Sequence, residues 1–575
     1  MAIIVKNVER PRELKWYKAG AMLYGDWGTS KAYVLGIAFA LAGHASWFYL
    51  GLMAAFTALI GFCYTIICRV YPDGGGVYSS LRNRSRIFAV IGALMLIADY
   101  VVTASLSALS AFQYFNVSHP EIWAIGAILM IGAINWIGPG KSGSIATLIA
   151  LMASVAAGVL LLFTLPHLHD LSLQLPKQSF SKGWSVFTGM VLALSGVEAV
   201  ANMTGIMVRP VGRTSKFAIW PVLIEVSLLT FLLGVAMNAI PGLTNHIEDM
   251  LRALGAYYVS AWYGEFISIV FALLLLSAVN TAVNSLVSMQ FLMAKDSELP
   301  NIFSKLNFHG MPWLSLIVAV FVPSIVLFFV HDLVSLAALY AIGVVGAITI
   351  NLGACALNQR IALKTWERSL LYASSATLLL IEITIALQKT HALIFASSVV
   401  VAGLLLRKMA KSVVPVKVSA VVTTAEILTV EDAKAISFLY QSSFLLAMRT
   451  LNYHLMDETA LLVKARGERA VYFCVIEPMP PLSELPEVLE PSSEFLQFLS
   501  EVDQEMERRG VMVIPVWQIG HNPGELIADV AKKLEVKTVI MGTTKRGALI
   551  NLLRGNVLHA LHNNLHKDCH LVIIG

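Results

Sequence analysis

Long apolar segments recur along the first 400 residues, and most have about the length that a helix needs to cross a bilayer. Roughly 20 residues cover the hydrocarbon core. Short polar, charged or Pro-Gly stretches separate these segments, whereas residues after 407 follow the mixed pattern of a soluble protein. We therefore expect twelve membrane-spanning helices, near 19–41, 46–70, 86–115, 121–138, 143–166, 184–206, 217–241, 262–294, 313–331, 334–357, 368–387 and 391–407.

Composition supports a membrane protein. Charged residues make up 13% of the 575 positions, against about 25% in soluble domains. The five cysteines show no metal-ligand spacing, so we interpret them as small buried residues in a reducing compartment. We predict four parts: a cytoplasmic N-terminus (1–18), a transporter domain (19–407), a linker (408–435) and a cytoplasmic α/β domain (436–575).

Lys and Arg in the connections predict how the spans are oriented. The N-terminus and the loops after even-numbered spans hold 18 of them, and the loops after odd-numbered spans hold 4. Cytoplasmic loops are the ones enriched in these residues. We therefore expect a multi-pass protein of the bacterial inner (plasma) membrane with both termini in the cytoplasm. The net charge of +5 reflects this bias rather than nucleic-acid binding.

Spans 1 and 6 are interrupted by glycines beside an acid, at 25–30 and 195–199. Breaks at corresponding positions of two halves indicate an inverted repeat, here of five plus five spans, with a binding site near the midplane. Irregular backbone at that depth is tolerated where it lines a cavity. The alternative is a simple glycine kink in a packed helix.

Three acids, Asp26, Asp99 and Glu198, fall in mid-span. A charge there costs roughly 2.5 to 3.5 kcal/mol on insertion scales, so each needs a partner or a role. Thr103 and Ser107 follow Asp99 at four-residue intervals and share its helix face. Hard oxygens with negative charge suit a hard cation better than the carboxylate of an amino acid. Alternatively, Asp26 and Asp99 are structural, bonded to hydroxyls or paired with Lys31.

Glu198 has no basic residue nearby in sequence, so a proton can neutralise it. We hypothesise that Glu198 carries a coupling proton, the alternative being a permanently protonated structural residue. Glu225 and Glu382 have no neighbouring acid or break, and we interpret them as helix–helix contacts.

Several motifs resemble the amino acid–polyamine–organocation superfamily and, within it, the KimA-type potassium importers. The motifs are Tyr71-Pro72-Asp73-Gly74-Gly75-Gly76-Val77-Tyr78, Asp99-Tyr100-Val101-Val102-Thr103, Ser195-Gly196-Val197-Glu198-Ala199, Asn280-Thr281 and Ala294-Lys295-Asp296-Ser297-Glu298-Leu299-Pro300. Span 1 is also similar to the Gly-Asp-x-Gly-Thr-Ser signature of Kup-type potassium transporters. The resemblance implies a LeuT-type fold and proton-coupled potassium uptake. It also implies site residues: potassium at Asp26, Tyr33, Asp99, Ser107 and Tyr340, with Thr103 and Ser195 lining the site and the proton on Glu198.

Lys31 departs from the potassium-importer pattern, which has an apolar residue one turn past the first break. A lysine ammonium there could act as a tethered cation, pairing with Asp26 in place of a coupling ion or blocking potassium. The alternative is a lysine whose side chain reaches the extracellular end of span 1.

The tail alternates strand-like runs (416–422, 470–476, 511–517) with amphipathic helices (493–509, 523–534), which predicts a small parallel α/β domain. Its last 60 residues resemble the universal stress protein domain. Gly542 and Gly555 match that family's nucleotide loop, but Lys545 and Asn556 replace a glycine and a hydroxyl. A nucleotide site at Gly542, Lys545, Gly547, Gly555 and Asn556 is one expectation, and a degenerate regulatory or dimerising domain is the other.

We thus expect a proton-coupled potassium symporter that needs no cofactor and pairs as a homodimer through its tails, a property the resemblance implies. The alternatives are a proton-coupled amino-acid or amine symporter and a transporter-derived sensor. No enzyme motif is present in the sequence.

Overall fold

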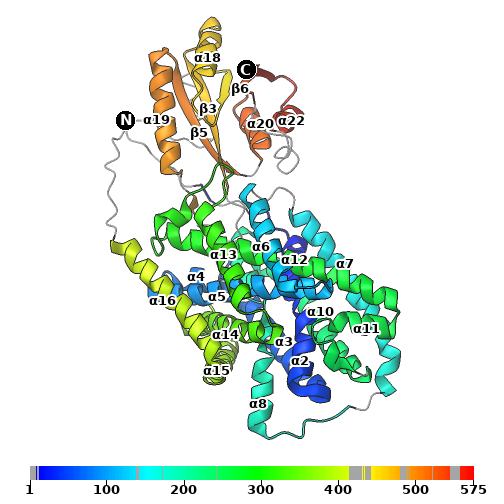
Figure 1. The fold of residues 1–575 in the computed structure, drawn as a ribbon. Helices are drawn as coiled ribbons and strands as arrows, with labels where there is room; N and C mark the ends of the chain where they lie inside the picture. Colours follow the sequence, from blue (N-terminus) through cyan, green and yellow to red (C-terminus); the bar gives the residue numbers. More distant parts are fainter. Residues whose placement is uncertain are drawn as a thin grey trace.

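The computed structural model of the chain has two parts, a large helix bundle and a smaller α/β domain at one end of it (Figure 1). It describes residues 8–9, 12–137, 142–170, 173–240, 242–412, 430, 433, 442–479, 488–489, 491–520, 522–543 and 557–574.

A helix lies at each of the twelve apolar positions of the sequence. The long helices are α1 (Trp16–Trp27), α2 (Ser30–Ala42), α3 (Ser46–Val70), α5 (Arg86–Tyr114), α6 (Pro120–Ile137), α7 (Ser142–Thr164), α8 (Phe180–Gly189), α10 (Val211–Ala236), α12 (Ala261–Lys295), α13 (Trp313–Phe329), α14 (Leu333–Leu357), α15 (Thr365–Gln388) and α16 (Thr390–Ser412). Shorter helical pieces connect them, among them α4 (Val77–Leu81), η3 (Val191–Leu194), α9 (Ala199–Asn202), η4 (Thr204–Ile206), α11 (Met250–Tyr258) and η7 (Asn301–Ser304).

Length and apolar composition make this a multi-pass membrane protein. Within the described residues, nine helical stretches are long and apolar enough to cross a bilayer, or ten if the bent pair that includes α8 forms one span. One of these stretches, from Trp16 to Val70, contains α1, α2 and α3, and α13 is a further apolar helix of 17 residues.

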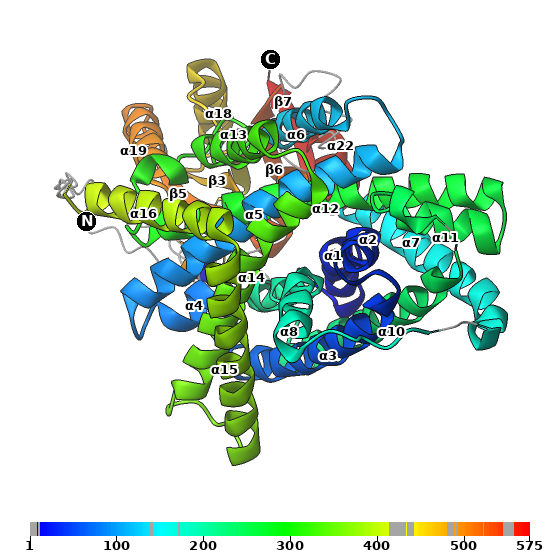
Figure 2. The same cartoon turned by 60° about the horizontal axis from the view of Figure 1, so that its bottom comes forward.

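The first span lies inside the bundle. Figure 2 shows α1 and α2 surrounded by α3, α7, α8, α10 and α12. Small residues let neighbouring helices approach closely, as is common in membranes. Gly234 of α10 packs against Leu50 of α3, and Gly343 of α14 packs against the backbone of Asp99 on α5. One continuous apolar core therefore connects the broken spans to the rest of the bundle.

The break in span 1 is narrower than the sequence predicts. Helix α1 continues through Gly25 and Asp26 to Trp27, and α2 begins at Ser30, so two residues separate them. The amide of Gly28 still donates to the carbonyl oxygen of Tyr24 at 2.8 Å, which keeps the last turn of α1 helical. The expected interruption over 25–30 is therefore confined to Gly28 and Thr29.

The tail is a three-layer α/β sandwich with a five-stranded parallel sheet in the order β5-β3-β2-β6-β7. The strands are β2 (Phe444–Ala447), β3 (Ala470–Pro478), β5 (Met512–Gly520), β6 (Thr538–Gly542) and β7 (His570–Ile574), and the helices are α18 (Tyr453–Ala465), α19 (Ser493–Arg508), α20 (Pro523–Lys533) and α22 (Val557–Asn564). A two-stranded pair joins β1 (Val8–Glu9) to β4 (Val488–Leu489).

The two faces of this sheet build two separate cores. Helices α18 and α19 cover Leu446 and Phe473 on one face, and α20 and α22 cover Leu445 and Tyr472 on the other. Because these strands are buried on both faces, their sequences are nearly continuous runs of apolar residues, as is typical of parallel sheets. The predicted strands at 470–476 and 511–517 and both predicted helices are confirmed, β2 was missed, and the predicted strand at 416–422 lies outside the described residues.

Candidate functional site

The sixth span is bent and then interrupted, and the interruption lies where the sequence places its glycine. Helix α8 ends at Gly189, and the segment from Val191 to Ile206, which begins with η3, has an axis 41° away from that of α8. Ser195 leaves the helical region, with φ −49° and ψ 133°, and Gly196 has φ +85°. That φ lies in the left-handed region, which glycine adopts at little cost and other residues rarely adopt. The predicted break at 195–199 is therefore present.

The break of span 6 touches the last turn of α1, next to the break of span 1, at Gly196. A Cβ atom placed there would lie 2.8 Å from the backbone nitrogen of Trp27 and 3.0 Å from Cγ of Asp26. The first of these contacts is with a backbone atom of Trp27, which cannot move aside as the end of a flexible side chain can. The two interrupted spans thus meet next to the first of the predicted acids.

Gly196→Ala tests this contact. We expect the variant to lose about 30-fold of the transport activity that the family resemblance implies, because strain of roughly 1–3 kcal/mol is added at the left-handed position and the two spans are pushed apart. Uptake assays on protein matched for membrane level measure this loss. Gly126→Ala on α6 is the control, since a Cβ there meets no atom within 4 Å; equal activity of the two variants would contradict the prediction.

Three carboxylates gather around this contact. Asp26 lies in the last turn of α1, Asp99 in the middle of α5 and Glu198 two residues after Gly196. All three are within electrostatic range of one another. Each is 5% exposed or less. A charge withdrawn from water needs a proton or a counter-ion, and three neighbouring acids make that need larger.

Hydroxyl groups from four segments face the same acids. Thr103 donates to the carbonyl oxygen of Asp99 at 2.9 Å and lies 3.4 Å from its Oδ1. Tyr340 of α14 donates to Oγ of Ser195 and faces Asp99. Tyr33 of α2 faces Ser195 and both aspartates. The structure therefore brings together six of the seven residues predicted to bind the cation.

Ser107 is the seventh, and it lies further along α5. Eight residues separate it from Asp99, which is about 12 Å at 1.5 Å per residue. Its hydroxyl is buried, with no hydrogen-bond partner in the described part of the chain. Ser107 is thus too far from Asp99 for the two side chains to bind the same ion. It lies where it could line a second ion position along the same face of α5.

Several acid oxygens in the cluster have unused hydrogen-bonding capacity. Oδ1 of Asp26, Oδ2 of Asp99 and both carboxylate oxygens of Glu198 are buried and lack a hydrogen-bond partner among the described residues. Buried polar atoms are normally satisfied, so exceptions need an explanation. Carboxylate and hydroxyl oxygens are the donors that hard cations prefer. The cluster has the donor chemistry that suits a desolvated hard cation or a proton.

Lys31 does not lie where either sequence interpretation places it. Its ammonium is fully buried and contacts both carboxylate oxygens of Glu225 on α10, at 2.6 and 2.7 Å, and the hydroxyl of Tyr24 at 3.0 Å. The ammonium neither pairs with Asp26 nor reaches solvent at the end of the span. The reason is helical phase: five residues place Lys31 about 140° from Asp26 around the span, whereas seven residues place it on the face of Tyr24.

The two acids interpreted as helix–helix contacts have different surroundings. Glu225 joins α10 to both halves of span 1 through Lys31 and Tyr24. Glu382 of α15 faces Gly346 of α14, and its Oε2 is buried without a hydrogen-bond partner among the described residues. Glu225 therefore makes an interhelical ion pair, and Glu382 lies at a helix contact and forms no ion pair with the residues that the structure describes.

The structure adds polar residues that the sequence pattern did not single out. Tyr64 of α3 has a buried hydroxyl that faces Glu198. Asn202, four residues after Glu198, donates to the hydroxyl of Tyr100 at 2.8 Å. A lone tyrosine or asparagine in an apolar span gives no spacing signal, and only the bend of span 6 brings these side chains near the acids.

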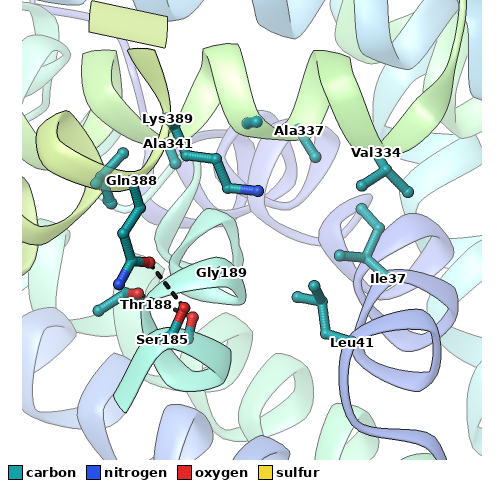
Figure 3. Close-up of a pocket in the computed structure, with 12 residues that line it drawn as sticks. Ile37, Leu41, Ser185, Thr188, Gly189, Val334, Ala337, Ala341, Gln388 and Lys389 are labelled. Carbon is teal, nitrogen blue, oxygen red and sulfur yellow. Dashed lines mark hydrogen bonds between the residues drawn. The ribbon is translucent and has the colours of Figure 1, made fainter. Parts of the chain in front are cut away.

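A pocket (Figure 3) lies among helices at the end of the bundle that Figure 1 shows farthest from the tail. Residues of α2, α8, α14 and α15 line it. Ile37 lies one turn after Tyr33 on α2, and Ala341 directly follows Tyr340 on α14. Ser185 donates to Oε1 of Gln388 at 2.7 Å across the pocket wall. The pocket thus approaches the acid cluster from one end of the bundle.

The predicted nucleotide loop is described only at its first residue. Gly542 ends β6, and Lys545, Gly547, Gly555 and Asn556 lie outside the described residues. A nucleotide on the tail therefore stays a prediction.

Comparison with known proteins identifies the family. The sequence profile of the amino acid permease family matches residues 14–415, which is most of the chain. The chain belongs to this family. The profile of the universal stress protein family matches residues 451–572, so the amino acid permease domain is followed by a universal stress protein domain.

Two individual relatives match parts of the chain. Potassium transporter KimA of Bacillus subtilis (strain 168) is 27% identical over 334 residues, covering 51% of this chain and 53% of that protein. The chain thus matches about half the length of this relative. The solved structure of a universal stress protein from Archaeoglobus fulgidus is 17% identical and covers 23% of this chain and 97% of its own, with a TM-score of 0.19. The matches to the helix bundle are transport proteins, not enzymes.

Proposed function

We propose that the chain is a secondary active transporter that takes up potassium ions together with protons. The observation that carries this proposal is the cluster of Asp26, Asp99 and Glu198 beside the contact between the two broken spans. Buried acids with unpartnered oxygens attract a cation and repel the carboxylate of an amino acid. The similarity to a potassium transporter supports potassium as that cation.

We further propose twelve spans arranged as a five-plus-five inverted repeat of the LeuT type, with both termini in the cytoplasm. Helices at all twelve expected positions and interruptions in the first and sixth support this arrangement. A membrane potential of 100 mV, negative inside, then contributes about 2.3 kcal/mol to the inward movement of each cation. The pairing of two chains through their tails stays a prediction.

Uptake into liposomes tests the cargo. The purified full chain, reconstituted with an acidic outside and a negative inside, is expected to accumulate potassium or its analogue rubidium. Accumulation should collapse when a protonophore removes the pH gradient and the potential together. If labelled methylammonium or amino acids accumulate and rubidium does not, the cargo is an amine or amino acid and the potassium proposal is wrong.

We also propose that the tail regulates transport through direct contacts with the bundle. Arg449, just after β2, donates to the carbonyl oxygen of Phe308 at 2.6 Å and lies over its ring, 4.7 Å from the centroid. Phe308 belongs to the connection between α12 and α13, and the neighbouring Gly310 packs against Pro478 at the end of β3. The carboxyl ends of two central strands therefore rest on a bundle loop. In parallel α/β sheets, that edge is where ligands bind.

Arg449→Ala tests this contact. We expect it to raise the maximal uptake rate about threefold with KM unchanged, because a docked tail restrains loop movement during the transport cycle. Arg466→Ala is a matched control, since Arg466 lies over the ring of Phe444 inside the tail and makes a similar cation–π contact. Equal rates in the two variants and the wild type would show that the contact does not regulate transport.

A further inference from the structure

A second charged site in the bundle lies on the opposite side of span 1 from the acid cluster. Lys31, Glu225 and Tyr24 form a closed triangle of hydrogen bonds, with Tyr24 donating to Oε1 of Glu225 at 2.8 Å. The side chain of Lys31 is fully buried and that of Glu225 is 18% exposed. The ammonium also lies 4.8 Å from the centroid of the Tyr24 ring. Each group is therefore satisfied by the others.

The triangle joins three helices at the first break. Tyr24 precedes Gly28 and Thr29 on α1, and Lys31 follows them on α2. Both are held by one carboxylate on α10, a helix that packs along α3 and α1. Only local backbone hydrogen bonds, such as those from Thr29 to Asp26 at 3.3 Å and from Ala32 to Thr29 at 2.9 Å, cross the interruption. The carboxylate adds a side-chain tie from a third helix to both halves of span 1. Asp26 and Tyr33, which face the cation site, lie within two residues of the tied positions.

We propose that Glu225 and Lys31 are positioning residues that hold both halves of the first broken span in the geometry that binds the cation. This inference rests on the proposed transport function and deepens it. The Lys31–Glu225 ion pair does not contact Asp26, Asp99 or Glu198. Its role is to raise the fraction of molecules in which Asp26 and Tyr33 both face Asp99. When only part of a population is competent to bind, the apparent affinity falls by that fraction.

Removing one charge alone leaves the other buried and unpaired, so Lys31→Met or Glu225→Gln can fail to fold. Two other variants avoid this difficulty. Lys31→Met/Glu225→Met replaces both charges by apolar side chains of similar length, a change that buried ion pairs often tolerate. Tyr24→Phe keeps both charges paired and removes only the hydroxyl that ties the first half of the span.

We expect both variants to reach wild-type membrane levels and to bind the cation less tightly. KM for rubidium should rise about tenfold in the double variant and about threefold in Tyr24→Phe, with maximal rates within about threefold of wild type. The charge reversal Lys31→Glu/Glu225→Lys, which rebuilds an ion pair between the same helices, should recover at least part of the affinity. A purely structural ion pair would change the amount of folded protein and leave KM unchanged.

Hydrogen exchange in purified protein supplies a readout that needs no cargo. Backbone amides of residues 16–42 should exchange about tenfold faster in the double variant, because the two halves of the span are no longer tied. Arg69→Met/Glu367→Gln is the matched control: Arg69 contacts Glu367 at 2.8 Å between α3 and α15, away from both breaks. It should leave both KM and exchange in 16–42 unchanged.

The outcomes separate the two proposals. If the wild type accumulates no rubidium, potassium transport is wrong, and the exchange comparison still decides on the positioning role. If the double variant folds with wild-type KM and wild-type exchange over residues 16–42, the positioning role is wrong whatever the cargo.

Discussion

Asp99→Asn is expected to lower potassium uptake at least about 100-fold, the largest effect we expect from a single cation ligand. Asparagine keeps the size and one carbonyl oxygen but removes the charge that compensates a desolvated cation. Truncating one partner of a buried charge pair typically costs 2–5 kcal/mol, and about 3 kcal/mol corresponds to a factor near 100. Rubidium uptake at limiting concentration measures the loss, and Asp26→Asn should act in the same direction.

The control for this result is another buried acid in the same bundle. Glu382→Gln removes a mid-span carboxylate on α15 that lies outside the acid cluster. It should keep uptake within about threefold of wild type, since mutations away from the site act mainly on stability. Uptake by Asp99→Asn at the wild-type rate, with folding intact, would show that the acid cluster does not bind the cargo.

The positions of the helices could be predicted from hydrophobic length alone because each span must bury its backbone polar groups within itself. The interruption of span 6 at Gly196 could also be predicted from the sequence, since a glycine beside an acid in mid-span has few structural explanations. The width of the break in span 1 could not be predicted from the sequence. Whether Gly25 and Asp26 stay helical depends on the hydrogen bond from Gly28 to Tyr24 and on the ties that hold both sides of the break.

The partner of Lys31 shows the limit of reasoning from proximity in sequence. Asp26 is five residues away and Glu225 nearly two hundred, yet helical phase turns Lys31 away from the first and toward the second. A count of charges along the chain gives no information about which helices are neighbours. The acids, in contrast, could be selected from sequence because every one of them is costly in a membrane and few residues share that property.

Glu198→Gln is expected to separate potassium movement from proton movement. Glutamine is close in shape to a protonated glutamate but cannot release or take up the proton. Glu198 lies in the sixth-span break, within electrostatic range of Asp26 and Asp99, so its charge state and the occupancy of the cation site must influence each other. Each unit of pH difference contributes about 1.4 kcal/mol per proton, a factor of ten in accumulation. The Glu198→Gln variant should lose this tenfold accumulation per unit of pH difference.

Two measurements on the same liposomes test this prediction, one of pH-driven accumulation and one of exchange without a gradient. Rubidium accumulation driven by a pH difference of one unit, with the potential clamped at zero, should fall about tenfold in Glu198→Gln, while rubidium exchange without any gradient should stay within about threefold of wild type. Glu382→Gln should keep both. The separation follows because exchange requires only the cation ligands, whereas net accumulation requires a group that changes its proton between the two sides. If Glu198 is instead permanently protonated, glutamine replaces it without consequence, and pH-driven accumulation in the variant will equal that of the wild type.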